Sequence, residues 1–193
     1  MAEVPSTFQL APGSPAPDFS LPDASGALHS PASLVLGKRG LLVVFACNHC
    51  PYVVHLADAL GRFAADIAGR GVATAAIASN DTERYPADAP ERMPEFADAH
   101  GWAFPYLHDA TQEVAHAYAA ACTPDFYLFD DALRLVYAGQ FDESRPGRGV
   151  PTGADLAAAV EQLLADQPAP EPWYPSTGCN IKWKPGNEPD YFG

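Results

Sequence analysis

The segment of residues 41–52 limits the folds open to this chain more than any other feature. Its first five residues, Leu41-Leu42-Val43-Val44-Phe45, are apolar and partly β-branched, which is typical of a buried strand. A Cys-x-x-Cys motif, Cys47-Asn48-His49-Cys50, follows, and Pro51 then opens a long amphipathic pattern. Proline suits the first turn of a helix because it has no backbone N–H to leave unpaired. The sequence therefore predicts a strand, a turn with two thiols, and a helix.

The expected position of Cys50 gives its thiol a distinct chemistry. If Pro51 is the first helical residue, Cys50 is the N-cap and faces backbone N–H groups that have no partner inside the helix. This end of a helix favours an anion, so we expect the pKa of Cys50 to lie below the ~8.5 of a free thiol. Since the thiolate is the reactive form, Cys50 is the predicted nucleophile.

Composition and charge narrow the class of protein. The chain has 193 residues, of which 48% are hydrophobic and 18% charged, as expected for one soluble domain with a sizeable core. Its net charge of −13 argues against a nucleic-acid partner, because no basic stripe is available for phosphates. We find neither a leader-like segment nor an apolar run of membrane length, and we expect a cytoplasmic protein without a membrane partner. Four cysteines are few for a disulfide scaffold, so the Cys-x-x-Cys indicates redox chemistry or metal binding.

Hydrophobic spacing predicts further elements around this unit. The helical pattern from Pro51 ends at Gly69-Arg70-Gly71, and residues 72–78 are typical of a strand buried on both faces. The other expected elements are a hairpin of residues 18–21 and 27–29, a helix within 90–100, a strand at 104–107, a helix with a capping box at 109–112, a hairpin of 125–129 and 133–137, and a helix that begins with a capping-box pattern at 152–155 and extends to 164.

Three stretches together resemble the thioredoxin fold and, within it, the redoxin or peroxiredoxin-like proteins. The first is the strand, Cys-x-x-Cys and helix. The second is Thr123-Pro124 before a hairpin, where that fold keeps a cis-proline facing the active thiol; the third, Ala16-Pro17-Asp18-Phe19-Ser20-Leu21, is similar to the N-terminal hairpin of peroxiredoxin-related proteins. The resemblance implies an α/β, thioredoxin-like fold with a central mixed sheet flanked by helices, an N-terminal β-hairpin and an extended C-terminal tail.

A narrower resemblance covers nearly the whole chain. Four motifs are similar to those of a bacterial peroxiredoxin-like family related to alkyl hydroperoxide reductase and thiol-specific antioxidant proteins: Asn48-His49-Cys50-Pro51-Tyr52-Val53, Ser79-Asn80-Asp81, Thr123-Pro124-Asp125-Phe126 and Gly178-Cys179-Asn180-Ile181-Lys182-Trp183. This match implies the fold more firmly than the reaction.

Two departures from peroxiredoxins bear on the reaction. In that family a Thr three residues before the peroxidatic Cys and a Pro seven residues before it help to bind peroxide. Here Cys47 and Val43 stand at those positions relative to Cys50, and Val44 and Gly40 relative to Cys47. Aligned without gaps on thioredoxin-like proteins, Cys50 takes the place of their first, nucleophilic Cys. The resemblance therefore favours disulfide exchange over fast peroxide reduction.

The end of the chain differs in composition from the rest. We expect a thioredoxin-like domain in residues 1–166 and a Pro-rich, aromatic tail in residues 167–193, which contains Trp173, Trp183 and Phe192. Such a tail needs an apolar surface to pack on, either on this domain or on a second copy in a homodimer. It also carries a single thiol, Cys179.

The leading hypothesis is a thiol–disulfide oxidoreductase or a thiol-dependent, antioxidant peroxidase. Cys50 attacks a disulfide or peroxide substrate, and either Cys47 or Cys179 then forms the internal disulfide, which a cellular thiol reductant reduces. No cofactor is expected. His49 either lowers the pKa of the neighbouring thiol or only caps the turn. Cys122 either joins the thiols or fills space in the core.

The Thr123-Pro124 pair has an expected role beside these thiols. If Pro124 is cis, the Thr123 backbone presents hydrogen-bonding groups to an extended substrate next to Cys50.

Two hypotheses from other classes remain open. The first is a zinc or copper site built from Cys47, Cys50 and His49 or His55, completed by Cys122 or Cys179. Against it, the Cys-x-x-Cys occurs once and has no second close pair. The other is a binding module that uses the cis-proline groove without turnover.

Overall fold

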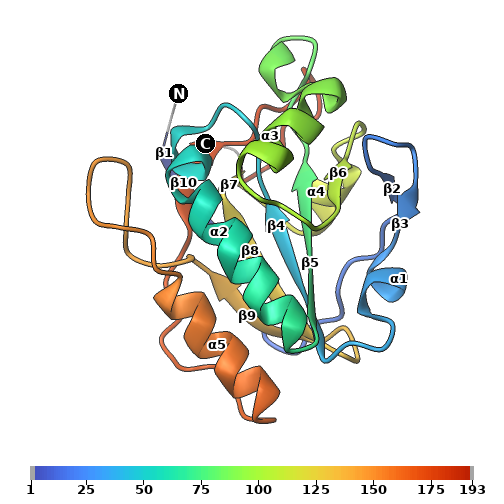
Figure 1. Ribbon diagram of the computed structural model, residues 1–193. Helices are drawn as coiled ribbons and strands as arrows, with labels where there is room; N and C mark the ends of the chain where they lie inside the picture. Colours follow the sequence, from blue (N-terminus) through green and yellow to red (C-terminus); the bar gives the residue numbers. More distant parts are fainter. Residues whose placement is uncertain (1–2, 192–193) are drawn as a thin grey trace.

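The computed structural model describes residues 3–191 and arranges most of them around a five-stranded sheet (Figure 1). Its strands, in spatial order, are β6 (Tyr106–His108), β5 (Val72–Ala78), β4 (Gly40–Phe45), β8 (Asp125–Asp130) and β9 (Leu135–Gly139). β4 is parallel to β5 and antiparallel to β8, so the sheet is mixed, as predicted. All residues of the central strand β4 are buried.

Three helices cover one face of this sheet. They are α2 (Pro51–Gly69), α3 (Met93–Ala99), preceded by the 3₁₀ turns η1 (Pro86–Asp88) and η2 (Pro90–Arg92), and α5 (Ala154–Leu164). Their apolar side chains pack with Leu42 and Val44 of β4 in one core cluster. The predicted helix from Pro51 is therefore confirmed, and it begins directly after the Cys-x-x-Cys.

The other face is covered by shorter elements. α1 (Pro31–Val35), α4 (Glu113–Ala117) and the tail residues Ile181 and Trp183 pack against Leu41, Val43 and Phe45 of β4. Side chains alternate between the two faces along a strand. The continuous apolar run of β4 therefore supplies both halves of the core.

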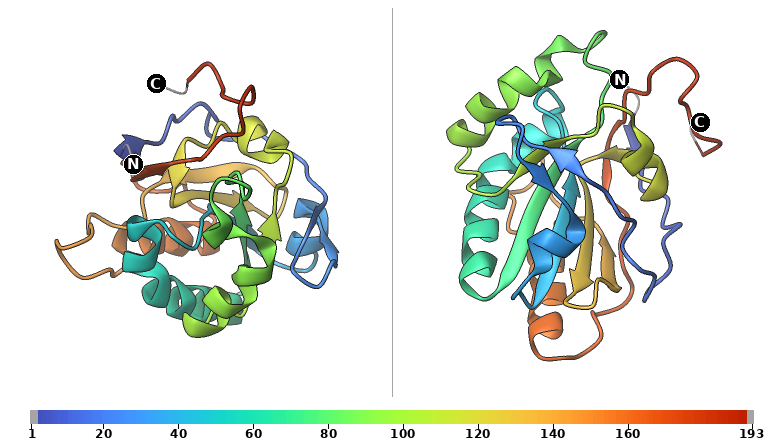
Figure 2. Two further views of the ribbon diagram at one scale, coloured as in Figure 1. Left: turned by 90° about the horizontal axis from the view of Figure 1, so that it is seen from above. Right: turned by 90° about the vertical axis from the view of Figure 1, so that its right-hand side faces the viewer.

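The two ends of the chain meet in a second, smaller sheet. β1 (Glu3–Pro5), β10 (Thr177–Asn180) and β7 (Cys122–Thr123) form it, with β10 in the middle. Figures 1 and 2 show β10 beside the start of α2. A separate hairpin of β2 (Leu21–Pro22) and β3 (Leu28–His29) confirms the predicted N-terminal hairpin, although its first strand begins at Leu21 rather than at residue 18. Phe192 lies outside the described residues.

Two strands of the main sheet also begin later than predicted. The strand predicted at 104–107 is β6, which starts at Tyr106 because Pro105 has no N–H to donate to the ladder. In the second hairpin, the strand predicted from residue 133 starts at Leu135. Leu133 has a left-handed backbone, φ 58°, and belongs to the turn.

Both predicted capping boxes are wrong, because more distant groups occupy their donors and acceptors. α4 begins at Glu113 rather than near Asp109, and the side chain of Gln112 donates to the Ser79 and Lys182 carbonyls. At α5 the residue before the helix is Gly153, and the Asp142 carboxylate accepts its N–H. The sequence prediction also omitted α1, whose Ser30–Ser33 capping box is a local signal for a helix start.

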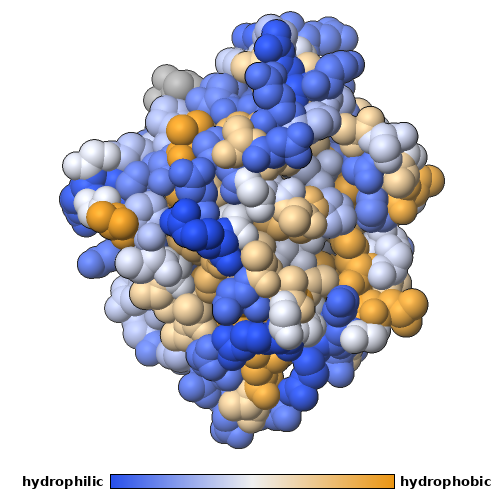
Figure 3. Space-filling model, viewed as in Figure 1, coloured by the Kyte–Doolittle hydropathy of each residue, from blue (hydrophilic) through white to orange (hydrophobic). Residues whose placement is uncertain are grey.

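The surface agrees with the acidic composition. Figure 3 shows hydrophilic side chains across the face that carries α2 and α5, interrupted by small apolar patches. None of the helices in residues 3–191 has the length and apolar content that a membrane crossing requires.

Two glycines of α2 test how tightly this helix packs. A Cβ at Gly61 would lie 2.2 Å from the His100 carbonyl oxygen, whereas a Cβ at Gly69 meets nothing within 4 Å. We expect Gly61→Ala to lower the free energy of unfolding by roughly 1–3 kcal/mol through overpacking. Gly69→Ala, the matched control, should raise it by up to about 1 kcal/mol because alanine favours the helix. Urea unfolding measures both, and equal effects at the two sites would contradict the packing described here.

Candidate active site

Cys50 lies at the junction of β4 and α2, in the position that the sequence predicts. It is the N-cap of α2, with extended backbone angles, and Pro51 is the first residue of the helix. The Cys50 side chain has no solvent exposure, and Cys47 at the end of β4 is 1% exposed. The two thiols of the Cys-x-x-Cys are therefore both inside the protein, at the positive end of a 19-residue helix.

The Thr123–Pro124 peptide is cis and faces these thiols. In its protonated form the Cys50 thiol donates to the Thr123 carbonyl oxygen, with Sγ and O 3.1 Å apart, and ionisation of Cys50 removes this bond. Cys47 Sγ lies 3.4 Å from Thr123 Oγ1, and either atom can be the donor. The backbone and the side chain of one residue thus contact the two thiols of the motif.

A third thiol reaches the same place from the tail. Cys179 of β10 pairs directly with Thr123 of β7, and the Cys179 side chain is 4% exposed. The neighbouring Gly178 packs flat on the cis peptide: a Cβ there would lie 2.0 Å from the Thr123 carbonyl oxygen. Glycine at this position lets β10 approach close enough to bring Cys179 to Cys50.

The three thiols have very different proton affinities. Hydrogen bonding from Cys47 lowers the pKa of Cys50 to about 5; burial opposes this, and hydrogen bonds from Thr123, Cys179 and the Val53 N–H add to the lowering. The same bond to Cys50, together with burial, holds the pKa of Cys47 well above its usual value. Burial and the bond to Cys50 raise the pKa of Cys179 to about 12. The site therefore has one thiolate, at Cys50, between two protonated thiols.

A buried carboxylate that the sequence analysis missed holds the loop between the two cysteines. Asp88, 1% exposed, accepts the backbone N–H groups of Asn48 at 2.8 Å and His49 at 3.3 Å. Its other oxygen lies 2.6 Å from His49 Nδ1 and accepts from Asn80 Nδ2 at 2.8 Å. Burial alone raises the pKa of Asp88, but the bonds from His49 and Asn80 outweigh it and lower that pKa below its ordinary value. No local motif marks Asp88, because the loop residues that it holds, Asn48 and His49, lie 40 and 39 residues away.

The His49 ring is held by its hydrogen bond with the Asp88 carboxylate. The ring also stacks on Tyr85, with centroids 5.7 Å apart. Of the two predicted roles, the structure supplies contacts for the second: His49 helps to fix the turn.

The structure brings together a set of potential metal ligands that differs from the predicted set. Potential donor atoms of Cys47, His49 and Asp88 lie within 4.8 Å of one another, whereas Cys50, His55, Cys122 and Cys179 are outside this group. The Asp88 oxygens already accept hydrogen bonds, so a cation would have to replace those from His49 or Asn80. The donors present are therefore committed to holding the loop.

Two of the predicted site residues make their hydrogen bonds to groups other than Cys47 and Cys50. Cys122 is fully buried and donates to the Pro124 carbonyl oxygen at 3.6 Å, in the role of a packed residue. His55 lies one turn into α2 and bonds to Ser144 Oγ at 3.1 Å.

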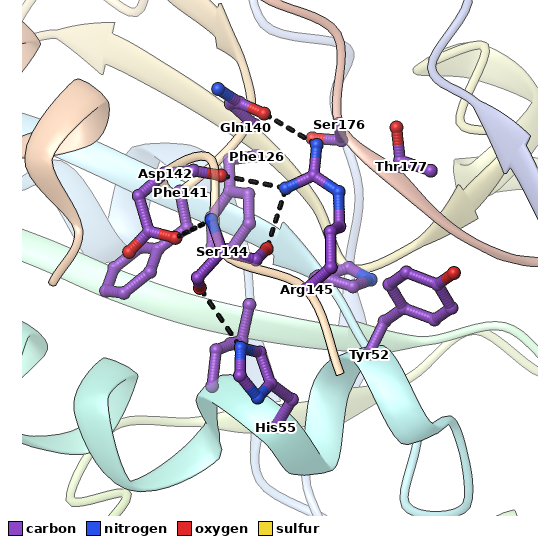
Figure 4. Close-up of a pocket in the computed structure, with 12 residues that line it drawn as sticks. Tyr52, His55, Phe126, Gln140, Phe141, Asp142, Ser144, Arg145, Ser176 and Thr177 are labelled. Carbon is purple, nitrogen blue, oxygen red and sulfur yellow. Dashed lines mark hydrogen bonds between the residues drawn. The ribbon is translucent and has the colours of Figure 1, made fainter. Parts of the chain in front are cut away.

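A small pocket lies beside the cis-proline. Figure 4 shows Tyr52, His55 and Arg145 among the residues that line it; the first two come from α2. The Arg145 guanidinium donates to the Gln140 side-chain oxygen and to the carbonyl oxygens of Asp142 and Ser144. The cavity measures about 20 Å³, which is room for about one water. A cavity of this volume has no space for a substrate. Ser176 and Thr177, next to and in β10, form part of its wall.

Comparisons with known proteins agree on the family. Residues 12–138 match the model of the AhpC/TSA family. A Mycobacterium tuberculosis protein, provisionally named a peroxiredoxin, is 32% identical over 114 residues, which cover 59% of this chain and 67% of that protein.

Solved structures agree with the fold over nearly the whole chain. A hypothetical protein of Sinorhizobium meliloti is 49% identical, with a TM-score of 0.91 over 94% of this chain and 99% of its own. An uncharacterized conserved protein of Geobacillus kaustophilus is 47% identical, with a TM-score of 0.92 over 96% and 98%. A thioredoxin domain from Bacteroides vulgatus, 19% identical, has a TM-score of 0.60 over 79% of this chain and 99% of that domain. The predicted thioredoxin-like fold is confirmed.

The carboxyl group that follows the cis-proline should make stability depend on pH. Asp125 is 1% exposed, and burial raises its pKa from 3.8 to about 7, although Tyr127 donates to it at 3.0 Å. Between these values the folded protein holds a proton that the unfolded chain has released, so stability falls as the pH rises. Relative to Asp125→Asn, the wild type should lose up to about 1.4 kcal/mol per pH unit between pH 4 and 7.

Urea unfolding at several pH values measures this difference. The exposed Asp131 provides the control, since Asp131→Asn should run parallel to the wild type across the same range. A constant offset between Asp125→Asn and the wild type would show that Asp125 has an ordinary pKa.

Proposed function

The chain belongs to the AhpC/TSA family, and we propose that it is a thiol–disulfide oxidoreductase with Cys50 as the nucleophile and Cys47 as the resolving thiol. One observation supports this most directly: Cys50 has a pKa of about 5 at the N-terminus of α2, with hydrogen bonding from Cys47 as the largest cause. The two thiols are three residues apart and share one buried cluster, so Cys47 is well placed to resolve a mixed disulfide at Cys50.

The reaction follows from these two thiols. The Cys50 thiolate attacks one sulfur of the substrate disulfide, and the first substrate thiolate leaves. Cys47 then gives up its proton and attacks Cys50 Sγ, which breaks the mixed disulfide and releases the second substrate thiolate. The substrate gains two electrons, and its two thiolates take up the Cys47 proton and one proton from the solvent, while Cys47 and Cys50 become a disulfide. A cellular dithiol reverses these steps on the protein and restores both thiols.

The raised pKa of Cys47 fits the order of these steps. While Cys50 is an anion, the bond from Cys47 favours the protonated form of Cys47. Once Cys50 is part of a mixed disulfide, that anion is gone and Cys47 ionises more easily. The resolving thiol therefore becomes a stronger nucleophile only after the first step has taken place.

Two features favour disulfide exchange over rapid peroxide reduction. The chain has Cys47 and Val43 where peroxiredoxins carry the Thr and Pro of the peroxide pocket. The cis-proline loop offers Thr123 for pairing with an extended strand, and β10 now occupies that position. Since Cys50 is buried, a polypeptide disulfide must displace part of β10 to reach it. That exchange replaces one strand by another and leaves the main sheet intact.

Reaction with a small neutral disulfide tests this proposal. We expect the reduced protein, mixed with one equivalent of bis(2-hydroxyethyl) disulfide, to form an internal disulfide and release two mercaptoethanol molecules. Cys50→Ser should lower the rate at least about 100-fold, because the activated thiolate is lost. Cys179→Ser should still form the Cys47–Cys50 bond. Mass spectrometry of the quenched protein and its peptides follows each product.

Cys122→Ser is the matched control, because Cys122 is a buried thiol that contacts Pro124 rather than the reacting sulfurs. It should react at the wild-type rate. A Cys50→Ser protein that reacts as fast as the wild type would contradict the proposal. Zinc bound to the purified protein with all four thiols unreactive would instead favour a metal site at Cys47, His49 and Asp88.

A further inference from the structure

The sulfur of Cys50 has two thiol neighbours, which come from different elements. Cys47 precedes it in the loop after β4, and Cys179 approaches from β10, over 100 residues later in the sequence. Cys47, Cys50 and Cys179 belong to one buried cluster, and both neighbours lower the pKa of Cys50. The proposed function uses only Cys47, so the contact with Cys179 has no role in it.

The position of Cys179 is fixed by the backbone. β10 pairs with β7 so that Cys179 lies opposite Thr123, whose carbonyl oxygen is 3.1 Å from Cys50 Sγ. On its other side β10 pairs with β1, which puts Glu3 opposite Cys179. The segment is also anchored at both ends, by Ser176 bonding to the Gly139 carbonyl and by the Ile181 N–H bonding to the Ala121 carbonyl.

Gly178 makes this register specific. The space between its Cα and the Thr123–Pro124 peptide admits no Cβ. A larger residue would push β10 away from the cis-proline loop and with it the sulfur of the next residue. The close approach that glycine permits therefore serves the contact between Cys179 and Cys50.

We infer that Cys179 is a third catalytic thiol, which takes over the disulfide at Cys50 from Cys47 and transfers the oxidation to the C-terminal strand β10. This inference rests on the proposed function, because it needs Cys50 to react first. It adds an internal exchange in which Cys50 is the shared partner of two different thiols.

The step needs no further oxidant or reductant. Cys179 gives up its proton and attacks Cys50 Sγ in the Cys47–Cys50 disulfide. The bond between Cys47 and Cys50 breaks as the bond between Cys50 and Cys179 forms, and Cys47 leaves as a thiolate that takes up a proton. One disulfide and one thiol are present before and after, so the step is an isomerisation.

The exchange changes where the disulfide lies. A Cys47–Cys50 bond is enclosed in the loop that Asp88 holds, next to the main sheet. A Cys50–Cys179 bond ties α2 to the small sheet of β1, β10 and β7, where two short strands flank Cys179. Opening this sheet exposes the second bond to a reductant while the Asp88 loop stays in place.

Disulfide mapping in Cys47→Ser tests the inference. The reduced full-length variant is treated with one equivalent of bis(2-hydroxyethyl) disulfide, quenched with acid and N-ethylmaleimide, and digested for peptide mass spectrometry. We expect the mixed disulfide at Cys50 to convert to a Cys50–Cys179 bond. In the wild type, the Cys47–Cys50 bond that forms first should give way in part to Cys50–Cys179 without added reagent.

Gly178→Ala, combined with Cys47→Ser, tests the register. The Cys50–Cys179 bond should form severalfold more slowly in this double variant than in Cys47→Ser alone. Gly178→Ala by itself should still form the Cys47–Cys50 bond, which shows that the variant is folded. An unchanged rate in the double variant would overturn the argument from the register.

The outcomes separate the two proposals. A mixed disulfide at Cys50 that persists in Cys47→Ser, with Cys179 still alkylated by the quench, would overturn the role of Cys179 and leave the proposed function standing. A wild type whose Cys50 does not react would overturn the proposed function itself. Cys122→Ser should match the wild type throughout.

Discussion

The site depends on the stabilisation of one buried anion, the Cys50 thiolate. A charge without solvent contact is costly unless fixed donors surround it. The fold supplies them from four places: the N-terminus of α2, Cys47, Thr123 and Cys179. These donors come from the β4–α2 junction, the cis-proline loop and the tail, so the chain must be fully folded before Cys50 is activated. The thiolate is thus a property of the whole tertiary structure.

The same arrangement keeps the other thiols protonated. Each hydrogen bond that lowers the pKa of Cys50 raises that of its donor, and burial adds to the rise at Cys47 and Cys179. The network thereby assigns roles to chemically identical groups. Asp88 supports this arrangement indirectly. It accepts the backbone N–H groups of Asn48 and His49 and so fixes the loop between Cys47 and Cys50.

The sequence was sufficient for the parts of the site that local rules govern. An apolar strand, a Cys-x-x-Cys and a helix-starting proline place Cys50 at an N-cap, and the structure agrees. Thr123-Pro124 was found through the family resemblance. Asp88 was not predictable, and the sequence named Cys179 only as one of two alternative partners of Cys50, because both positions depend on how loops and the tail run in space.

The errors in the fold have the same origin. The capping boxes expected at 109–112 and 152–155 are patterns within four residues. Gln112 instead bonds to Ser79, 33 residues away, and the N–H groups of Thr152 and Gly153 bond to Asp142, 10 and 11 residues away. Competition from tertiary contacts decides such cases. Long periodic segments such as α2 and β5 were predictable because burial over many residues outweighs any single bond.

The central claim is that Cys50 is a thiolate at neutral pH and that its two neighbours are not. An NMR titration of protein labelled with ¹³C at the cysteine Cβ measures the ionisation of each thiol separately. The account predicts that Cys50 titrates near pH 5, while Cys47 and Cys179 remain protonated at pH 9. A Cys50 that titrates at the ~8.5 of a free thiol, or together with its neighbours, would contradict it.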